Sequence, residues 1–222
     1  MLILAPHADD EIIGCGGVIQ KYLKNGSAVR VVIASFVHGA YQKYQSEKGQ
    51  YQIYDGTTRL KELEQSYQVI GIENYHFLYT DKDQVQYHSR LDTIPRIELA
   101  SKLENEIQEF KPTVIYIPSI TKHQDHTALH EAALTATRPY FWRGSVLVYE
   151  TDGELSFQPN VFVPINRYEI DKKQDALKVY KTQVGSKRHP ISPQALLTKA
   201  MFRGQSIYSD FAEAFQVIRI HG

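Results

Sequence analysis

Cysteine, long apolar runs and an excess of charge are all scarce or absent in this chain of 222 residues. Cys15 is the single cysteine, which excludes a disulfide within the chain and suits a reducing compartment. No stretch reaches the roughly 18 consecutive apolar residues of a membrane-spanning helix, and no basic leader precedes the first apolar run. We therefore expect a cytoplasmic protein without a membrane anchor.

Charge is balanced, because 25 lysines and arginines face 25 aspartates and glutamates. Without a basic field the chain is not expected to bind nucleic acid or an anionic membrane. Many of the 15 tyrosines lie between Tyr41 and Tyr87, where they would line a polar pocket or an oligomer contact. A homo-oligomer is therefore left open.

Apolar runs alternate with helical patterns along the chain. The predicted strands cover residues 2–5, 29–36, 75–79, 113–118, 145–150 and 214–220. The predicted helices cover residues 16–24, 57–70, 95–110, 126–137, 169–182 and 193–203. This alternation predicts a Rossmann-like α/β fold, with a mostly parallel sheet and helices on both faces, in a single domain over residues 1–222. The polar, tyrosine-rich residues 37–56 are expected to form a loop over the carboxyl edge of the sheet.

Two polar clusters each follow a predicted strand. Residues 6–11 read Pro-His-Ala-Asp-Asp-Glu directly behind the first apolar run, and residues 123–126 read His-Gln-Asp-His behind the run at 114–117. Ligands in open α/β sheets gather at the carboxyl ends of the strands, so both clusters are expected to meet there. Either cluster alone is also typical of a polar loop that caps a helix. Together they predict one shared metal site.

Catalytic zinc commonly takes three protein ligands from histidine and carboxylate and leaves a position for water. His7, Asp10 and His126 supply such a set, although iron, cobalt or manganese stay open. Asp9 adjoins a ligand without being needed as one, so it is the candidate general base. The pair of clusters therefore predicts a metal-dependent hydrolase.

Two further residues of the second cluster have predicted roles in catalysis. His123 would protonate a leaving group or stabilise an oxyanion. Asp125 would hold one ring nitrogen of His123 and fix its tautomer. His130, four residues after His126, has zinc-binding spacing but is expected to lie too deep along the helix to be a ligand.

The two clusters resemble the signature motifs of the LmbE/PIG-L family of zinc-dependent deacetylases, and the similarity extends over nearly the whole chain. Residues 59–62, 176–183 and 211–215 are similar to the family's Arg-x-x-Glu helix, its late Ala-Leu helix with a glutamine, and its closing Ala-Glu-x-Phe strand. The family removes acetyl groups from compounds that contain N-acetylglucosamine, and it includes bacillithiol-type, mycothiol-type and diacetylchitobiose deacetylases. The resemblance implies zinc and an N-acetylated sugar substrate.

Residue by residue, the resemblance supports the metal and catalytic roles above and gives Arg59 a role in holding substrate hydroxyl or phosphate groups. The chain departs from the family at Thr121, where some relatives have a tyrosine, and at Tyr180 and Thr182, where many have a histidine and a serine. These departures leave the metal ligands intact and concern the substrate and the oxyanion partner.

Three alternatives accompany this interpretation. The scaffold would also suit an amide hydrolase for a non-sugar or longer-acyl substrate, or a sugar- or nucleotide-binding protein without catalysis. A nucleotide-dependent Rossmann enzyme is disfavoured, because residues 14–17 (Gly-Cys-Gly-Gly) lack the G-x-G-x-x-G spacing. These glycines are instead expected to pack the first helix closely on the sheet, with Cys15 buried.

Overall fold

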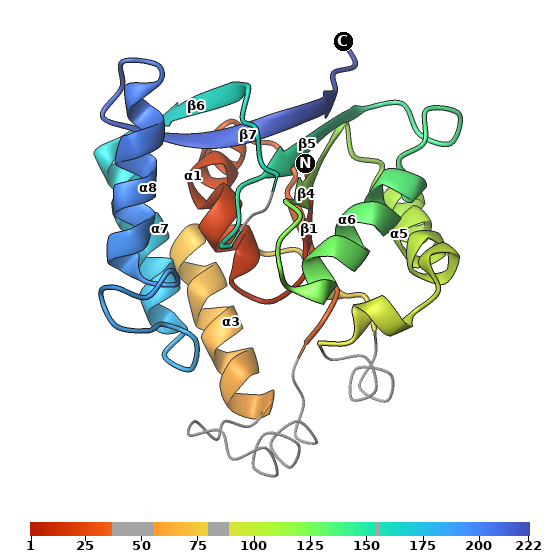
Figure 1. The fold of residues 1–222 in the computed structure, drawn as a ribbon, viewed down its shortest axis with the longest axis horizontal. Coiled ribbons are helices and arrows are strands. Elements are labelled where there is room, and N and C mark those ends of the chain that lie inside the picture. Colours follow the sequence, from red (N-terminus) through yellow and green to blue (C-terminus); the bar gives the residue numbers. More distant parts are fainter. Residues whose placement is uncertain (37–55, 80–88, 154–155) are drawn as a thin grey trace.

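The computed structural model describes residues 1–36, 56–79, 89–153 and 156–222, and its centre is a seven-stranded sheet (Figure 1). The strands lie in the order β3-β2-β1-β4-β5-β7-β6. In chain order the strands are β1 (Leu2–Ala5), β2 (Arg30–Ile33), β3 (Tyr75–Phe77), β4 (Val114–Pro118), β5 (Ser145–Tyr149), β6 (Val161–Ile165) and β7 (Phe211–Arg219). The predicted loop at 37–56 lies outside the described residues, except for Gly56.

The sheet is mostly parallel, as predicted. Strands β1 to β5 pair in parallel, whereas β7 runs antiparallel to both β5 and β6. The chain leaves β1 towards β2 on one side and later returns to β4 on the other side of β1. Such a reversal of strand order opens a crevice at the carboxyl ends, where ligands bind in folds of this kind. The loops that follow β1 and β4 flank this position.

Helices cover both faces of the sheet because its strands alternate between two apolar cores. One core contains Ile3 with helices α1, α3 and α7, and the other contains Leu2 with helices α5 and α6. The described helices are α1 (Asp10–Lys24), α3 (Gly56–Ile70), η1 (Leu91–Thr93), α5 (Arg96–Phe110), α6 (Gln124–Ala136), α7 (Arg167–Val179) and α8 (Pro193–Gln205). The doubly covered, mostly parallel sheet confirms the predicted fold class.

Helix α1 begins six residues earlier than predicted, because its glycines are packing positions and not helix breakers. A Cβ atom at Gly14 would lie 2.1 Å from the ring of Tyr149, and one at Gly17 would lie 2.6 Å from Ile165. The glycines therefore let the helix backbone approach the sheet, as expected, and Cys15 is fully buried beside them.

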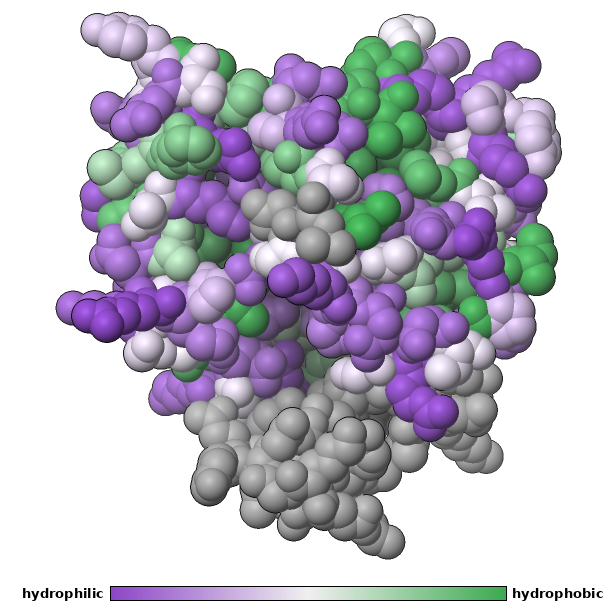
Figure 2. All heavy atoms as spheres, in the orientation of Figure 1, coloured by the Kyte–Doolittle hydropathy of each residue, from purple (hydrophilic) through white to green (hydrophobic). Residues whose placement is uncertain are grey.

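Strand β6 was not predicted from the sequence. It contains Pro164, which lacks a backbone N–H and is tolerated because β6 pairs on one side only, with β7. Among the described residues, no helix is long and apolar enough to cross a membrane. Figure 2 shows hydrophilic residues spread over much of the face that it presents.

Candidate metal centre and active site

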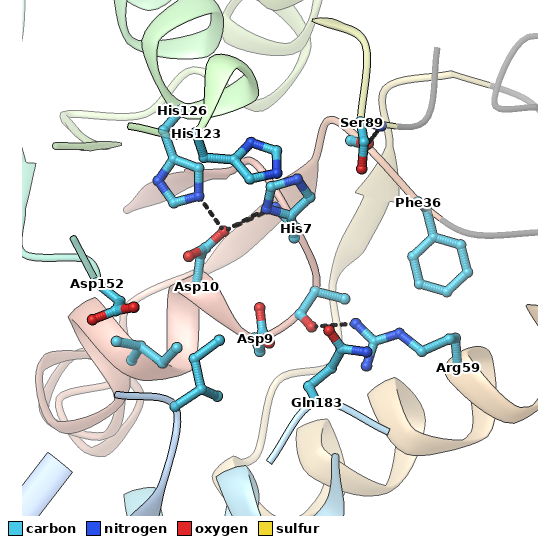
Figure 3. A pocket seen from close by; sticks show the side chains of 14 residues that line it. His7, Asp9, Asp10, Phe36, Arg59, Ser89, His123, His126, Asp152 and Gln183 are labelled. Carbon is cyan, nitrogen blue, oxygen red and sulfur yellow. Dashed lines mark hydrogen bonds and ion pairs between the residues drawn. The ribbon is translucent and has the colours of Figure 1, made fainter. Parts of the chain in front are cut away.

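Both predicted clusters line one cavity of about 300 Å³ at the carboxyl edge of the sheet. The loop after β1 and the start of α6 contribute the polar groups, which point towards one another in Figure 3. The described residues that line the cavity are His7, Ala8, Asp9, Asp10, Ile13, Ser35, Phe36, Arg59, Ser89, His123, His126, Asp152, Gln183 and Ile191. Six of the seven predicted site residues therefore line this cavity, and the seventh, Asp125, does not.

The three predicted metal ligands converge on a single point. His7 Nδ1 lies 3.2 Å from Asp10 Oδ2, and His126 Nε2 lies 3.3 Å from the same oxygen. One ligand atom from each residue falls within 4.8 Å of the other two. The pKa of Asp10 is held far below its usual range, because the charge and hydrogen bonding of His126 and His7 outweigh the opposing effect of burial. Asp10 is thus an ionised, buried carboxylate between two imidazoles.

The far side of His7 is held by a buried carboxylate. His7 Nε2 lies 3.1 Å from Asp125 Oδ2, and the other oxygen of Asp125 accepts the backbone N–H of Leu91 at 2.9 Å. Burial opposes protonation of His7, but hydrogen bonds to Asp10 and Asp125 outweigh it and raise its pKa to about 10. A carboxylate on the outer nitrogen of an imidazole orients that ring for metal binding.

Asp125 therefore differs from its predicted role. Its carboxylate contacts His7, whereas the prediction placed it on His123. Residue 125 reaches His123 through its backbone, whose N–H donates to His123 Nδ1 at 3.2 Å. His123 is the N-cap of α6, so the helix begins at Gln124 and not at the predicted residue 126. The sequence could not show which atoms of a capping loop face inward.

His123 presents its second ring nitrogen to the cavity as a neutral donor. Because Nδ1 accepts the Asp125 N–H, the proton of the neutral ring is on Nε2. Burial, followed by the neighbouring His7, lowers the pKa of His123. A neutral imidazole that carries Nε2–H can donate a hydrogen bond to a developing oxyanion.

Asp9 has a strained backbone at the point where the first loop, residues 6–9 after β1, enters helix α1. Its φ angle is 150°, a conformation that L residues rarely adopt. The Asp9 N–H donates at 3.1 Å to Glu11 Oε2, and Glu11 is fully buried. Strain of this kind persists only where the surroundings enforce it, and it is concentrated at functional sites. Glu11 therefore supports the conformation of Asp9.

The carboxylate of Asp9 itself faces the cavity. No described residue donates a hydrogen bond to it, and it lies beside Asp10 in Figure 3. Burial, together with the charge of Asp10, raises the pKa of Asp9 to about 7 against the opposing charge of Arg59. A carboxylate with a pKa near neutrality can accept and return a proton at physiological pH.

Arg59 lies in the cavity wall, but several of its donors already have protein partners. One Nη donates to the carbonyl of Ala8 at 2.9 Å, and the other lies 3.2 Å from both Glu62 and Thr182. The side chain is buried, and its Ala8 contact immediately precedes Asp9. Arg59 thus braces the first loop in addition to facing the cavity.

Of the three residues that depart from the family pattern, Tyr180 and Thr121 do not line the cavity, and Thr182 contacts Arg59 and Glu62. Tyr180 is fully buried, and its hydroxyl lies 3.5 Å from Glu11 Oε1, beneath the first loop. Thr121 is buried and accepts the backbone N–H of His123 at 3.0 Å. His130 likewise has a structural partner, since its Nδ1 donates to the carbonyl of Pro118 at 2.7 Å.

Several cavity residues were not predicted as site residues. Ser35 and Phe36 follow β2, and Asp152 follows β5, so each lies just beyond the carboxyl end of a parallel strand. The position after a strand was therefore a usable signal. This signal also marks loops that contain none of the predicted site residues.

The sequence comparison assigns the chain to a family. Residues 2–137 match the family model described as PIG-L, GlcNAc-PI de-N-acetylase. The chain belongs to this family. The PIG-L match contains both polar clusters, Arg59 and every strand from β1 to β4.

Three proteins illustrate the similarity beyond the PIG-L match. The uncharacterized deacetylase YaiS of Escherichia coli is 25% identical over 190 residues, which cover 82% of this chain and 90% of that protein. The diacetylchitobiose deacetylase of Thermococcus kodakarensis is 22% identical over 98% of this chain and 82% of its own length. The crystal structure of the conserved protein TT1542 from Thermus thermophilus superposes with a TM-score of 0.76 at 22% identity, covering 100% of this chain and 95% of the other. The last comparison confirms the fold.

Proposed function

We propose that this protein is a metal-dependent deacetylase that removes the N-acetyl group from a small molecule containing glucosamine. The observation that carries the proposal is the convergence of His7 Nδ1 and His126 Nε2 on one oxygen of Asp10. Family membership supports deacetylation as the reaction class. Zinc and the sugar substrate are the finer parts of the proposal.

The spacing of the donor atoms fits a tetrahedral zinc ion. Ligands about 2.0–2.1 Å from a tetrahedral centre lie roughly 3.3 Å apart. The distances from Asp10 Oδ2 to the two imidazole nitrogens are 3.2 and 3.3 Å, longer than the about 2.8 Å of a strong charge-assisted hydrogen bond. Two imidazoles and one carboxylate also form a common donor set of catalytic zinc. The residues present therefore fit the ion.

A divalent ion held by these three side chains would polarise the amide carbonyl and lower the pKa of a bound water. Asp9 then accepts the proton of the attacking water, because its carboxylate faces the cavity with a pKa near neutrality. His123 donates its Nε2–H to the oxygen of the carbonyl as negative charge develops there. The proton on Asp9 is then available for the leaving nitrogen. Asp125 keeps His7 in the tautomer that leaves Nδ1 free to ligate.

A small polar substrate suits the cavity. Its volume of about 300 Å³ is at the low end for ligand pockets, and its described wall is mostly polar with a few apolar side chains. The diacetylchitobiose deacetylase among the relatives supports an N-acetylated sugar. We further propose that residues 1–222 form one catalytic domain. A cytoplasmic location stays a prediction.

Acetate and free-amine release by zinc-loaded protein tests the proposal. We expect release from N-acetylglucosamine or its small glycosides, loss of release after chelation, and recovery on adding zinc. Release only from non-sugar amides or from longer acyl groups would favour the alternative amide hydrolase. Saturable sugar binding by metal-loaded protein without any amine release would favour the non-catalytic alternative.

A further inference from the structure

Asp152 contributes a carboxylate to the cavity from a loop that contains none of the predicted site residues. It follows β5 by three residues, and β5 pairs in parallel with β4, which precedes the second metal-ligand loop. Asp152 lines the same cavity as His7 and His126, and Figure 3 shows it on the side of Asp10 away from Arg59. It is therefore placed to meet a substrate whose amide lies at the metal centre.

The carboxylate of Asp152 has no partner among the described residues. Two cations bind the residues that precede Asp152 and do not contact its carboxylate. Arg203 donates to both oxygens of Glu150 at 2.7 and 3.0 Å, and Lys199 donates to the carbonyl of Thr151 at 3.0 Å. Asp152 is half-buried, so its charge is partly shielded from solvent without being neutralised by an ion pair. A group that enters the cavity would meet this charge.

The backbone on the N-terminal side of Asp152 is anchored. The hydroxyls of Thr151 and Ser119 lie 2.6 Å apart, and the backbone N–H of Thr151 donates to Ser119 at 3.2 Å. Thr151 is fully buried. The residue that precedes Asp152 is therefore held in place, which limits the positions that the Asp152 side chain can reach.

We infer that Asp152 is a specificity-determining residue. Its carboxylate accepts a hydrogen bond from a hydroxyl of the substrate and repels substrates with an anionic substituent on the Asp152 side of the cavity. This inference rests on the proposed deacetylase function. Asp9, Asp10 and Asp152 bring three carboxylates to the cavity wall, whereas the cation of Arg59 is already paired with Glu62. One divalent ion balances only two of these charges. The cavity thus favours neutral sugars over phosphorylated or carboxylated ones.

The inference is tested by the charge preference of Asp152→Asn against the wild type. The probes are N-acetylglucosamine, N-acetylglucosamine 6-phosphate and N-acetylmuramic acid, because the last two carry their anionic groups at different positions. The quantity measured is the ratio of kcat/KM for the neutral sugar to kcat/KM for each anionic sugar. We expect Asp152→Asn to lower this ratio about five- to tenfold for at least one anionic probe, and we expect added salt to shrink the effect.

Asp210→Asn is the matched control, because it removes an exposed carboxylate that does not line the cavity. It should leave the ratios unchanged. Unchanged ratios for both anionic probes in Asp152→Asn would overturn the inference while leaving the deacetylase function intact. A wild type that hydrolyses none of the probes would count against the proposed substrate instead.

In that case Asp152 is tested by calorimetric binding of the same three probes to zinc-loaded protein. Comparing each probe between the wild type and Asp152→Asn cancels the contribution of the metal. Tighter binding of an anionic probe to Asp152→Asn, relative to the neutral probe, supports the inference. Equal changes for all three probes overturn it.

Discussion

The two loops that build the proposed metal centre, residues 6–9 after β1 and 119–123 after β4, are supported in different ways. The first loop enters helix α1 through the strained Asp9, whose backbone is held by the buried Glu11 and whose neighbour Ala8 is braced by Arg59. The second loop enters α6 through His123, whose φ of −81° and ψ of 124° are ordinary for a helix cap. The first loop is strained and is held by the side chains of Glu11 and Arg59, whereas the second loop has an unstrained backbone at its helix cap.

The two loops therefore position the functional groups of one site in different ways. The first loop, with the start of α1, carries two of the three proposed ligands and the proposed base, so its strained geometry places most of the chemistry. The second loop, with the start of α6, carries one ligand, the oxyanion donor and Asp125, which bridges to His7 of the first loop at 3.1 Å. Changes in the supports of the first loop should therefore impair turnover more than equivalent changes around the second.

The largest effect is expected from removing a ligand from either loop. His7→Ala and His126→Ala should each lose most of the metal and all measurable turnover, because two remaining ligands hold zinc weakly. Asp125→Asn should weaken metal binding by about 10- to 100-fold, as loss of an outer carboxylate does. Elemental analysis after dialysis measures this, with the exposed His221→Ala as the control.

One ion per chain is expected in the wild type. Two other groups of possible ligands occur among the described residues. One of them, His7 with His123 and Asp125, shares His7 with the proposed site. In the other, His76 with Glu106 and Glu109, both glutamates already accept hydrogen bonds from Arg30 at 3.2 and 2.9 Å. Stoichiometric zinc in both His7→Ala and His126→Ala would show that the ion binds elsewhere.

The next effect concerns the proposed base of the first loop. Asp9→Asn should retain the metal and lower kcat about 100-fold or more, which is the usual contribution of a positioned proton acceptor. Since Asp9 must be ionised to act, wild-type kcat should fall as the pH drops through the pKa of Asp9. That pKa is about 7 without metal and is lower beside a cation.

A pH profile of kcat from pH 5 to 8 therefore shows an acidic limb in the wild type and none in Asp9→Asn. Near-normal turnover of Asp9→Asn with bound metal would assign the base to another residue. His123→Ala is expected to lower kcat by about 100-fold with the metal retained, which is the usual cost of losing one oxyanion donor.

A smaller effect directly compares the supports of the two loops. Glu11→Ala removes the acceptor of the Asp9 N–H, so Asp9 relaxes and kcat should fall about 10- to 100-fold with metal retained. Glu11→Gln keeps an acceptor oxygen and should recover most of this loss. Thr121→Ala removes the corresponding acceptor of the His123 N–H and should change kcat less than about threefold. The reason is that the backbone of His123 is unstrained and does not need this hydrogen bond to keep its conformation.

Metal content and thermal melting of the three variants show whether each remains folded and loaded. Equal losses of kcat in Glu11→Ala and Thr121→Ala would show that the strained first loop needs its side-chain acceptor no more than the unstrained second loop does.

The last prediction concerns Arg59, which faces the cavity and also braces Ala8 of the first loop, and its expected effect is larger on KM than on kcat. Arg59→Ala should raise KM about tenfold and lower kcat less, if the guanidinium holds substrate equally in the ground and transition states. It should also lower the free energy of unfolding by about 1–3 kcal/mol, because Ala8 and Glu62 lose a donor. Steady-state kinetics and urea unfolding measure the two effects separately. Equal losses in kcat and kcat/KM would instead mean that Arg59 affects turnover only through its support of the first loop and does not bind substrate.

Much of this fold could be read from the sequence, because buried parallel strands appear as short apolar runs. The prediction that the two polar clusters after β1 and β4 meet at one edge of the sheet is confirmed, since chain order and hydrophobicity suffice to place them there. Strand β6 was not predicted because Pro164 interrupts its apolar pattern. The proline is tolerated there because β6 is an edge strand, where a missing N–H costs little. The start of α1 was missed because Gly14 resembles a helix breaker until the ring of Tyr149 is seen against it.

The contacts within the site depend on the orientation of each side chain, which spacing in the sequence does not determine. The spacing of His123 and Asp125 suggested a pair of side chains, yet the carboxylate turns to His7, which is 118 residues away. Likewise, Glu11 was visible in the first motif, but its contact with the strained Asp9 follows only from the fold. Asp152 had no histidine nearby to mark it.

The central claim is that one ion held by both loops drives deacetylation, and a zinc titration of the chelated protein tests it most directly. Acetate release from N-acetylglucosamine is measured as zinc is added to a known concentration of chains. The account predicts no release without metal, a linear rise with added zinc, and a plateau at about one ion per chain. Release that persists in the chelated protein, or absence of release from a protein with one bound zinc across a panel of N-acetylated sugars, would contradict it.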